Sequence, residues 1–237
     1  MVSAIILAGG LGTRLRNEVP DLPKPMAPIN GKPFLEYLLD YWHTQGIEHF
    51  HLSIGYMGDK IYNYFGIKYK DAKLSYSIEN KPLGTGGGLK LSLNEISSHN
   101  DLLLLNGDTF FKIPLQEIKN FHLINNSLMT LSLFKFNESK RFGEIILDKN
   151  SSIINFKEKS ESLSGFANGG VYMLNKNKLR NFLQPFEREK VSLENDIIRL
   201  LIESKKILKG IKFKKPFLDI GVPKDFQKAG NFFNKLD

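Results

Sequence analysis

The sequence lacks cysteine altogether and contains one tryptophan and five histidines among its 237 residues. Without cysteine, disulfides and thiolate metal sites are excluded. The histidines show no spacing typical of a metal site. His49 and His51 would share one face of a strand, but two such residues do not by themselves indicate a ligand pair.

Long hydrophobic runs are also missing. No stretch approaches the roughly 18 apolar residues of a membrane-spanning helix. The first apolar run, residues 4–7, is too short for a signal peptide and has no basic segment before it. We therefore expect a cytoplasmic protein with no membrane partner. Hydrophobic residues form 41% of the chain and charged residues 24%, which is typical of a soluble globular protein.

The formal net charge of +8 raises the question of nucleic-acid binding. The 33 lysines and arginines are scattered, however, and no basic cluster with interleaved aromatic residues occurs. Nucleic acid is therefore not an expected partner. A mild positive field suits small polyanions such as a nucleotide or a sugar phosphate.

The first half of the chain alternates short apolar runs with segments of helical spacing. The patterns predict strands at residues 4–7, 49–54, 74–78 and 102–105, and helices at residues 34–45, 59–65 and 85–93. This alternation implies a parallel sheet with right-handed crossovers. The four leucines at 102–105 predict a central strand that is buried on both faces.

The second half has strands in quick succession, which predicts partly antiparallel pairing. Strands are expected at residues 128–134, 143–147, 153–157, 166–173 and 208–213, and helices at residues 193–202 and 223–233. No linker, repeat or low-complexity segment divides the chain. We expect one α/β domain over residues 1–237, with a Rossmann-like, mixed but mostly parallel sheet.

A glycine-rich segment at residues 8–14 (Ala-Gly-Gly-Leu-Gly-Thr-Arg) follows the first strand, and Lys24 lies between two prolines shortly after it. Glycine lets backbone N–H groups approach a phosphate or a flat base, and Arg14 and Lys24 can neutralise what the loop binds. The segment is not a Walker A motif, and it has only two of the three glycines of the dinucleotide fingerprint. It predicts a loop that binds a nucleoside triphosphate. A glycine-rich turn and a dinucleotide-dependent oxidoreductase are the alternatives.

Two aspartates occupy positions suited to a hard cation. Asp108 follows the four-leucine strand, and Asp219 precedes the last predicted helix. If the two converge, one Mg²⁺ could lie between them and a nucleotide α-phosphate. Asp108 could instead belong to an Asn-Gly turn or cap a helix, and Asp219 could be only a turn residue before the helix.

Residues 79–88 follow the third strand and contain Glu79, Gly84 and the triple glycine at 86–88. The glycines permit close approach of the backbone to a flat ligand. An ionised Glu79 can only accept hydrogen bonds, and guanine offers two adjacent donors, so this side chain favours guanine. The alternative is an exposed glutamate before a loop.

Two further segments suit a sugar phosphate. Glu158 and Lys159 end one predicted strand, and residues 168–172 (Asn-Gly-Gly-Val-Tyr) interrupt another. Glu158 and Asn168 suit sugar hydroxyls, and Lys159 suits the phosphate. Glu158 and Lys159 would point to opposite sides of a regular strand, so both can serve only if the strand ends or bulges there. A solvated run of charges is the alternative.

Together these motifs resemble the nucleotidyltransferases that make nucleotide-sugars from sugar 1-phosphates. The resemblance runs from residue 4 to residue 226 and rests on five separated motifs in the same order. Within that family, the stretches at 24–29, 82–87, 105–111 and 219–223 are most similar to the short guanylyltransferases for D-glycero-D-manno-heptose 1-phosphate. The resemblance implies a three-layer α/β sandwich, with a nucleotide-binding half over about residues 1–110 and a sugar-phosphate-binding half over about residues 111–237.

The resemblance also assigns residues to roles. It implies catalytic roles for Arg14, Lys24 and Asp108, and a metal site at Asp108 and Asp219. The nucleotide-binding residues that we expect are Leu7, Ala8, Gly9, Gly10, Gly12, Thr13, Glu79, Gly84 and Thr85. The sugar-phosphate-binding residues are Gly143, Glu158, Lys159, Asn168 and Gly169.

The implied reaction joins a nucleotide, with GTP favoured, to a sugar 1-phosphate and releases pyrophosphate. Mg²⁺ is the implied cofactor, the protein would be a monomer or homodimer, and the product would feed polysaccharide biosynthesis. Two other functions stay open. One is a uridylyl- or cytidylyltransferase acting on another sugar 1-phosphate or on phosphocholine. The other is a catalytically silent subunit that binds nucleotide-sugars.

Overall fold

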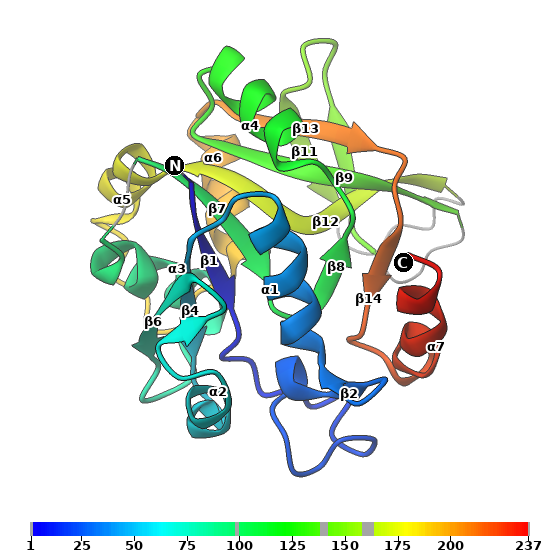
Figure 1. The fold of residues 1–237 in the computed structure, drawn as a ribbon. Helices are drawn as coiled ribbons and strands as arrows, with labels where there is room; N and C mark the ends of the chain where they lie inside the picture. The colour runs from blue at the N-terminus through cyan, green and yellow to red at the C-terminus, as the bar shows by residue number, and fades with distance from the viewer. Residues whose placement is uncertain (1, 98–99, 138–141, 158–163, 237) are drawn as a thin grey trace.

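An eight-stranded sheet forms the centre of the computed structural model, which describes residues 2–97, 100–137, 142–157 and 164–236 (Figure 1). The strand order is β13-β9-β12-β7-β1-β4-β6-β5. Strands β7, β1, β4 and β6 are mutually parallel, β12 is antiparallel to both its neighbours, β13 is parallel to β9, and β5 is antiparallel to β6. The bounds are β1 Ser3–Leu7, β4 His49–Ile54, β5 Lys68–Tyr69, β6 Ala72–Ile78, β7 Asp101–Asn106, β9 Met129–Asn137, β12 Ser164–Asn175 and β13 Leu208–Phe213.

Helices cover both faces of this sheet, which gives the three layers expected from the sequence (Figure 1). Buried side chains of α1, α2, α4 and α7 pack on one face, and those of α3, α5 and α6 pack on the other. The bounds are α1 Phe34–Thr44, α2 Gly58–Phe65, α3 Gly84–Glu95, α4 Leu115–Ile124, α5 Lys176–Leu183, α6 Arg199–Glu203 and α7 Pro223–Asn234. A 3₁₀ turn, η1, spans Lys24–Met26, and a π-helical turn, η2, spans Leu193–Ile198.

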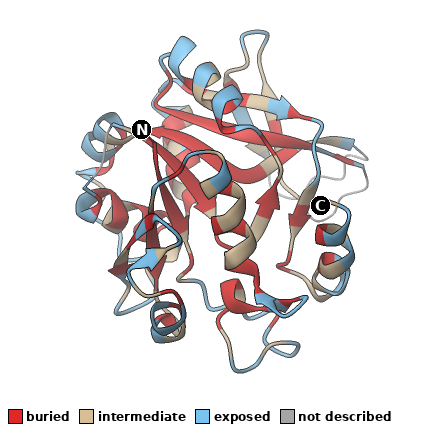
Figure 2. Ribbon diagram, viewed as in Figure 1, coloured by how far each residue is buried: buried red, intermediate tan, exposed pale blue. Residues whose placement is uncertain are grey.

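Strand β7 lies in the middle of the sheet and is buried on both faces, as the four leucines predict. Leu103 and Leu105 belong to the hydrophobic cluster on the α1 face, and Leu102 and Leu104 belong to the cluster on the α3 face. Each of the four is at most 1% exposed. The red strands at the centre of Figure 2 show the same double burial. A continuous apolar run is what a strand between two helical layers requires.

Three small two-stranded sheets flank the main sheet. One of them pairs β8 with β14 in antiparallel register, so that Asp219 lies opposite Thr109. This pairing joins the segment after β7 to a segment near the C-terminus, and it was not predicted. The bounds are β2 Pro28–Ile29 with β3 Lys32–Pro33, β8 Thr109–Phe111 with β14 Phe217–Asp219, and β10 Glu144–Leu147 with β11 Ile153–Lys157.

Every predicted helix and strand has a counterpart, with bounds shifted by a few residues at most, but some elements differ. Helices α4 and α5 were not predicted, and the helix expected at 193–202 is a π-helical turn followed by α6. The expected interruption at residues 168–172 is present, because the pairing of β12 with β9 shifts register between Asn168 and Tyr172. Within the described residues, no helix is both long enough and apolar enough to cross a membrane.

Candidate functional site

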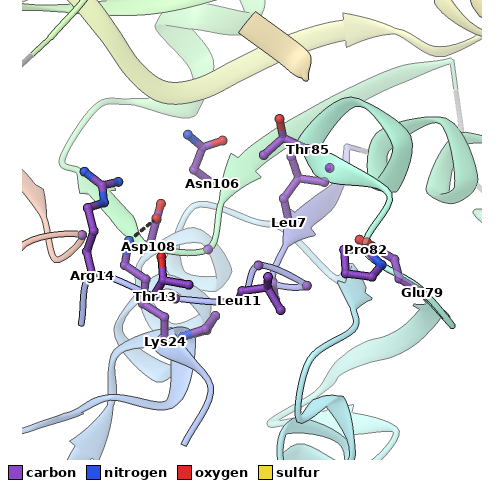
Figure 3. A pocket seen from close by; sticks show the side chains of 18 of the residues that line it. Leu7, Leu11, Thr13, Arg14, Lys24, Glu79, Pro82, Thr85, Asn106 and Asp108 are labelled. Atoms are coloured by element: carbon purple, nitrogen blue, oxygen red, sulfur yellow. Dashed lines mark hydrogen bonds and ion pairs between the residues drawn. The ribbon is translucent and has the colours of Figure 1, made fainter. Parts of the chain in front are cut away.

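A pocket with a volume of about 470 Å³ opens where β1, β6 and β7 end (Figure 3). Ligands of open α/β sheets bind at the carboxyl ends of the strands, and this pocket lies there. Most of its lining comes from the segments that follow these strands. The residues that line it are Leu7, Ala8, Gly9, Gly10, Leu11, Gly12, Thr13, Arg14, Lys24, Pro25, Glu79, Pro82, Gly84, Thr85, Asn106, Gly107, Asp108, Lys190, Glu194 and Gly221.

The glycine loop after β1 is fixed at its start by the two neighbouring strand ends. The Ala8 amide donates to the Ser53 carbonyl at 2.8 Å, and the Gly107 amide donates to the Leu7 carbonyl at 2.9 Å. Beyond that point the loop faces the pocket. A Cβ placed on Gly10 would meet no atom within 4 Å, so the space above Gly10 is open for a ligand. Gly12 has φ +59°, a backbone conformation that favours glycine.

The cations of the loop region lie at one end of the pocket. Arg14 and Lys24 both line it, and Figure 3 shows them beside Asp108. Lys24 is largely buried, and its ammonium donates to Asp108 Oδ2 at 2.5 Å. The arginine is exposed. One end of the pocket therefore carries two cations, one held by a carboxylate and the other open to solvent.

The two predicted metal ligands come together at this end. The Ile220 amide donates to the Asp108 carbonyl at 3.1 Å, which extends the pairing of β14 with β8 past Asp219. Asp219 Oδ1 accepts a hydrogen bond from the Gly221 amide at 2.6 Å. A Cβ on Gly221 would lie 2.6 Å from that oxygen and 2.8 Å from Lys24 Nζ. The Lys24 ammonium therefore lies close to both aspartates, although Asp219 itself does not line the pocket.

This donor set fits a cation that also binds phosphate. Among the described residues, no three or more acidic, histidine or cysteine side chains form a cluster that could hold a metal ion. Two carboxylates alone leave most of the coordination sphere to other oxygens, and Mg²⁺ in phosphate-binding sites has such an arrangement. Asp108 and Asp219 could therefore hold Mg²⁺ only together with substrate oxygens and water.

Glu79 lies at the other end of the pocket, beside Pro82 (Figure 3). Its Oε1 accepts from Ser53 Oγ at 3.3 Å, and its Oε2 accepts from the Leu83 amide at 3.0 Å. Partial burial raises the pKa of this carboxyl above its usual value, and the two hydrogen bonds oppose that rise. Each oxygen keeps lone-pair capacity for a further donor.

The glycines after Glu79 have a different role from the one predicted. Gly84 has φ +77°, and a Cβ there would lie 2.4 Å from the Val191 carbonyl oxygen. A Cβ on Gly86 would lie 2.7 Å from the Val191 side chain. These glycines give room to another part of the chain, and Gly86 to Gly88 do not line the pocket. The expected approach of the triple glycine to a flat ligand is therefore wrong, because protein atoms occupy that space. Gly84 and Thr85 do line the pocket.

Of the residues predicted to bind the sugar phosphate, the structure describes Gly143, Asn168 and Gly169, and none of these three lines the pocket. The Asn168 amide nitrogen donates to the Tyr172 hydroxyl at 2.5 Å, and its oxygen accepts from the Gly170 amide at 3.1 Å. A Cβ on Gly169 would lie 2.5 Å from the Phe111 ring. Gly143 directly precedes β10 and is partly exposed. Glu158 and Lys159 lie outside the described residues.

Several residues of the pocket were given no role by the sequence. The polar ones are Asn106, Lys190 and Glu194. Asn106 was noted only as part of the turn after β7. Glu194 lies inside the helix predicted at residues 193–202, and a glutamate in a surface helix is expected to face solvent. No local pattern indicates that η2 turns this side chain toward a pocket formed by the first half of the chain.

Comparison with known proteins identifies close relatives. The family model for nucleotidyl transferases matches residues 3–235. The D-glycero-alpha-D-manno-heptose 1-phosphate guanylyltransferase of Campylobacter jejuni subsp. jejuni is 42% identical over 227 residues, which cover 95% of this chain and 97% of that protein. The protein of the same name from Aneurinibacillus thermoaerophilus is 42% identical over 228 residues, 96% of each chain.

Solved structures of similar proteins also match this chain along nearly its whole length. The crystal structure of HddC from Yersinia pseudotuberculosis has a TM-score of 0.85 and 33% sequence identity, and the comparison covers 98% of this chain and 100% of that one. A crystal structure of HddC complexed with GMP-PN has the same TM-score of 0.85. Since the family model spans almost the whole sequence and these relatives match along nearly their full length, the chain belongs to the nucleotidyl transferase family.

Proposed function

We propose that this protein transfers a guanylyl group from GTP to D-glycero-D-manno-heptose 1-phosphate, giving a GDP-heptose and pyrophosphate. One observation carries the proposal. The open glycine loop, Lys24 and Asp108 line a single pocket, and Asp219 folds against the same lysine. The relatives named as heptose 1-phosphate guanylyltransferases support the choice of substrates.

The reaction needs one displacement at phosphorus. An oxygen of the sugar 1-phosphate forms a bond to the α-phosphorus of GTP while the bond to the β-phosphate bridging oxygen breaks, and pyrophosphate leaves. No protein nucleophile is required, so positioning and neutralisation of charge supply the acceleration. Arg14 and the loop amides bind the triphosphate, and Lys24 holds its ammonium beside the reacting phosphates.

We infer that Mg²⁺ is held by Asp108 and Asp219, with phosphate oxygens completing its coordination. When bound, the ion would neutralise phosphate charge and increase the electrophilicity of the phosphorus. The ion pair of Lys24 with Asp108 supports this assignment, because it shows that the carboxylate already attracts a cation at this end of the pocket. The lysine would then turn its charge toward the phosphates.

The base end of the pocket is assigned to Glu79. If the triphosphate lies at the Arg14 end, the base lies toward Glu79 and Pro82, which Figure 3 shows on the opposite side. A carboxylate there can accept from guanine N1–H and N2–H, whereas uracil offers one such donor. The structure of HddC complexed with GMP-PN supports a guanine nucleotide for this chain.

The assignments of the sugar-phosphate-binding residues Gly143, Glu158, Lys159, Asn168 and Gly169, and of the two halves of the domain, stay predictions. Asn168 is linked to the pocket residue Asn106 through Tyr172, so its expected contribution is to fix that part of the site. The cytoplasmic location and the monomeric or homodimeric state also stay predictions.

The function is tested with the purified protein, Mg²⁺, the four ribonucleoside triphosphates and a panel of sugar 1-phosphates that includes the heptose and mannose. Pyrophosphate release is measured, and the nucleotide-sugar is identified by mass spectrometry. We expect turnover with GTP and the heptose, and rejection of UTP by a factor of about 10⁴. Equal turnover of GTP and UTP would remove the assignment of guanine. Nucleotide binding without pyrophosphate release from any pair would instead indicate a silent subunit.

A further inference from the structure

Glu194 and Asn106 line the pocket, but neither has a role in the reaction described above. Apart from Glu79 and Asp108, Glu194 is the one carboxylate among the described residues that line it. It reaches the pocket from η2, in the second half of the chain, whereas the glycine loop comes from the first half. Its position therefore adds an acidic group on a side of the pocket that the nucleotide-binding loop does not form.

Backbone contacts hold this part of the chain in place. The Gly86 amide donates to the Val191 carbonyl at 2.8 Å, and the Val191 amide donates to the Leu83 carbonyl at 2.8 Å. The Leu193 amide donates to Thr85 Oγ1 at 2.9 Å. The segment that carries Glu194 is therefore docked onto the start of α3 through Val191 and Leu193. A π-helical turn at this point is consistent with a functional residue.

The surroundings of Glu194 favour neutral hydrogen-bond donors as its ligand. Burial raises the pKa of the carboxyl, the negative charge of Asp108 raises it further, and hydrogen bonds from Ser192 and Thr85 oppose the rise. A phosphate next to this carboxylate would be repelled, since both are negative. Hydroxyl groups are the donors that a sugar phosphate offers away from its phosphate, and a guanine nucleotide offers N–H groups on its base as well as ribose hydroxyls.

Asn106 adds a second acceptor on the same pocket. It hydrogen-bonds the Tyr172 hydroxyl, which also accepts from Asn168 Nδ2 at 2.5 Å. Asn106 Oδ1 is buried and has no hydrogen-bond partner among the described residues. An unpaired buried acceptor is destabilising unless a ligand or water donates to it. Figure 3 shows the Asn106 and Thr85 side chains between the Asp108 end and the Glu79 end of the pocket.

We propose that Glu194, assisted by Asn106, accepts hydrogen bonds from hydroxyl groups of the acceptor sugar and so determines which sugar 1-phosphate reacts. The proposal rests on the proposed function. The acceptor is favoured over the ribose of GTP because Glu194 lies on the part of the chain that does not carry the nucleotide-binding loop. Glu194 and Asn106 line the pocket, whereas Asn168, the sequence's candidate for sugar hydroxyls, does not.

The test compares the wild type with Glu194→Gln, which keeps the shape of the side chain and removes its charge. At saturating GTP, we expect the KM for the heptose 1-phosphate to rise roughly 10- to 100-fold, as for the loss of a hydrogen bond to a charged group. The affinity for GTP, measured by calorimetry without acceptor, should stay within about twofold, since Glu194 would not touch the nucleotide. Glu189→Gln is the matched control, because Glu189 is exposed, paired with Lys81 and outside the pocket.

A second readout uses sugar 1-phosphates that lack single hydroxyls. If Glu194 binds a particular hydroxyl of the sugar, the wild type discriminates against the analogue that lacks this hydroxyl, and Glu194→Gln does not. An unchanged KM for the sugar overturns the proposal. So does a weakened affinity for GTP together with loss of discrimination between GTP and dGTP, because that result assigns Glu194 to the ribose.

Two further measurements keep these outcomes interpretable. Thermal unfolding shows whether Glu194→Gln folds. If this variant does not fold, Glu194→Asp is used in its place, because aspartate keeps the charge and shortens the reach of the carboxylate. The same outcomes then apply to the aspartate variant. Failure of the proposed function looks different, because the wild type itself would then release no pyrophosphate with any sugar 1-phosphate.

Discussion

Two glycine-rich segments of this chain look alike in sequence and differ in structure. In the first, the space above Gly10 is open to the pocket. In the second, Cβ atoms on Gly84 and Gly86 would collide with Val191. A run of glycines can therefore serve the approach of a ligand or the approach of another part of the same chain. The sequence alone does not show whether a glycine run gives room to a ligand or to another part of the chain.

Glu79 connects the two segments. A Cβ on Gly9 would lie 2.6 Å from Glu79 Oε1, and a Cβ on Gly88 would lie 2.7 Å from the same atom. The carboxylate is thus enclosed between the first glycine segment and the second. The first segment leads to the phosphate end of the pocket, and the second positions the chain that carries Glu194. We therefore expect substitutions near the first segment to affect nucleotide binding or turnover, and substitutions in the second segment to affect the stability of the fold.

The largest effect is expected for Asp108→Asn, at the phosphate end. The substitution removes the charge that balances Lys24 and one of two proposed Mg²⁺ ligands. We expect turnover to fall by at least roughly 10²–10³, the loss typical of one preorganised electrostatic group. Pyrophosphate release at saturating substrates measures it. Asp59→Asn, on the exposed start of α2, serves as a control that should keep wild-type turnover.

Arg14→Ala should reduce turnover by roughly 10²–10³, because the guanidinium would no longer neutralise charge that moves onto pyrophosphate. Arg16 offers a close control. It lies two residues later, stacks over the Tyr56 ring at 5.2 Å and does not line the main pocket. We expect Arg16→Ala to keep most of the activity. Near-normal turnover of Arg14→Ala would show that the role given to Arg14 is incorrect.

The comparison between the glycine segments is tested most directly by Gly10→Ala and Gly84→Ala. Gly10→Ala should leave the melting temperature nearly unchanged, since nothing lies within 4 Å of the added Cβ, and should weaken GTP binding at least about tenfold. Gly84→Ala should destabilise the fold by roughly 1–3 kcal/mol, because its φ of +77° and the Val191 carbonyl both oppose a side chain. Each kcal/mol corresponds to a fall of about 2–4 °C in Tm.

Thermal unfolding and calorimetric titration with GTP separate the two variants. If Gly10→Ala unfolds early and binds GTP normally, the first segment is structural. If Gly84→Ala keeps the wild-type melting temperature, the contact with Val191 does not need glycine. Either result would remove the distinction between the segments.

The elements that could be predicted from the sequence are those with a strong local pattern. Strands β1 and β7 contain apolar runs, and β4 and β6 alternate apolar with polar residues; the predicted bounds of all four differ by two residues at most. Helix α5 was missed because Leu179 and Leu183 are its only buried residues, although Asn175 caps it by accepting from the Lys178 amide. That cap was an available signal.

The residues of the site can also be divided into those that a local sequence pattern predicts and those that no local pattern predicts. Residues of the glycine loop and Lys24 follow a recognisable motif, and the structure places them in one pocket. The proximity of Asp219 to Asp108 depends on the pairing of two three-residue strands far apart in the sequence, for which no local pattern exists. Glu194 was missed for a related reason, since its place in the pocket follows from the docking of Val191 onto α3. Long-range contacts of this kind are set by the whole fold.

The smallest expected effect concerns the pH dependence of stability, and it contrasts Glu79 with Glu189. Burial raises the pKa of Glu79 above its ordinary value of 4.5, so the folded state favours the protonated form. The contribution of Glu79 to the free energy of unfolding is therefore present below pH 4.5 and is lost as pH rises through the raised pKa. The ion pair with Lys81 lowers the pKa of Glu189, so the stabilisation from Glu189 is present above pH 4.5 and is lost as pH falls through the lowered pKa.

Thermal unfolding of Glu79→Gln and Glu189→Gln between pH 3.5 and pH 7 measures both contributions, as the difference between each variant and the wild type in the slope of stability against pH. We expect the two differences to have opposite signs, with the one for exposed Glu189 the smaller. Differences of the same sign would mean that Glu79 is not enclosed between the two glycine segments in solution.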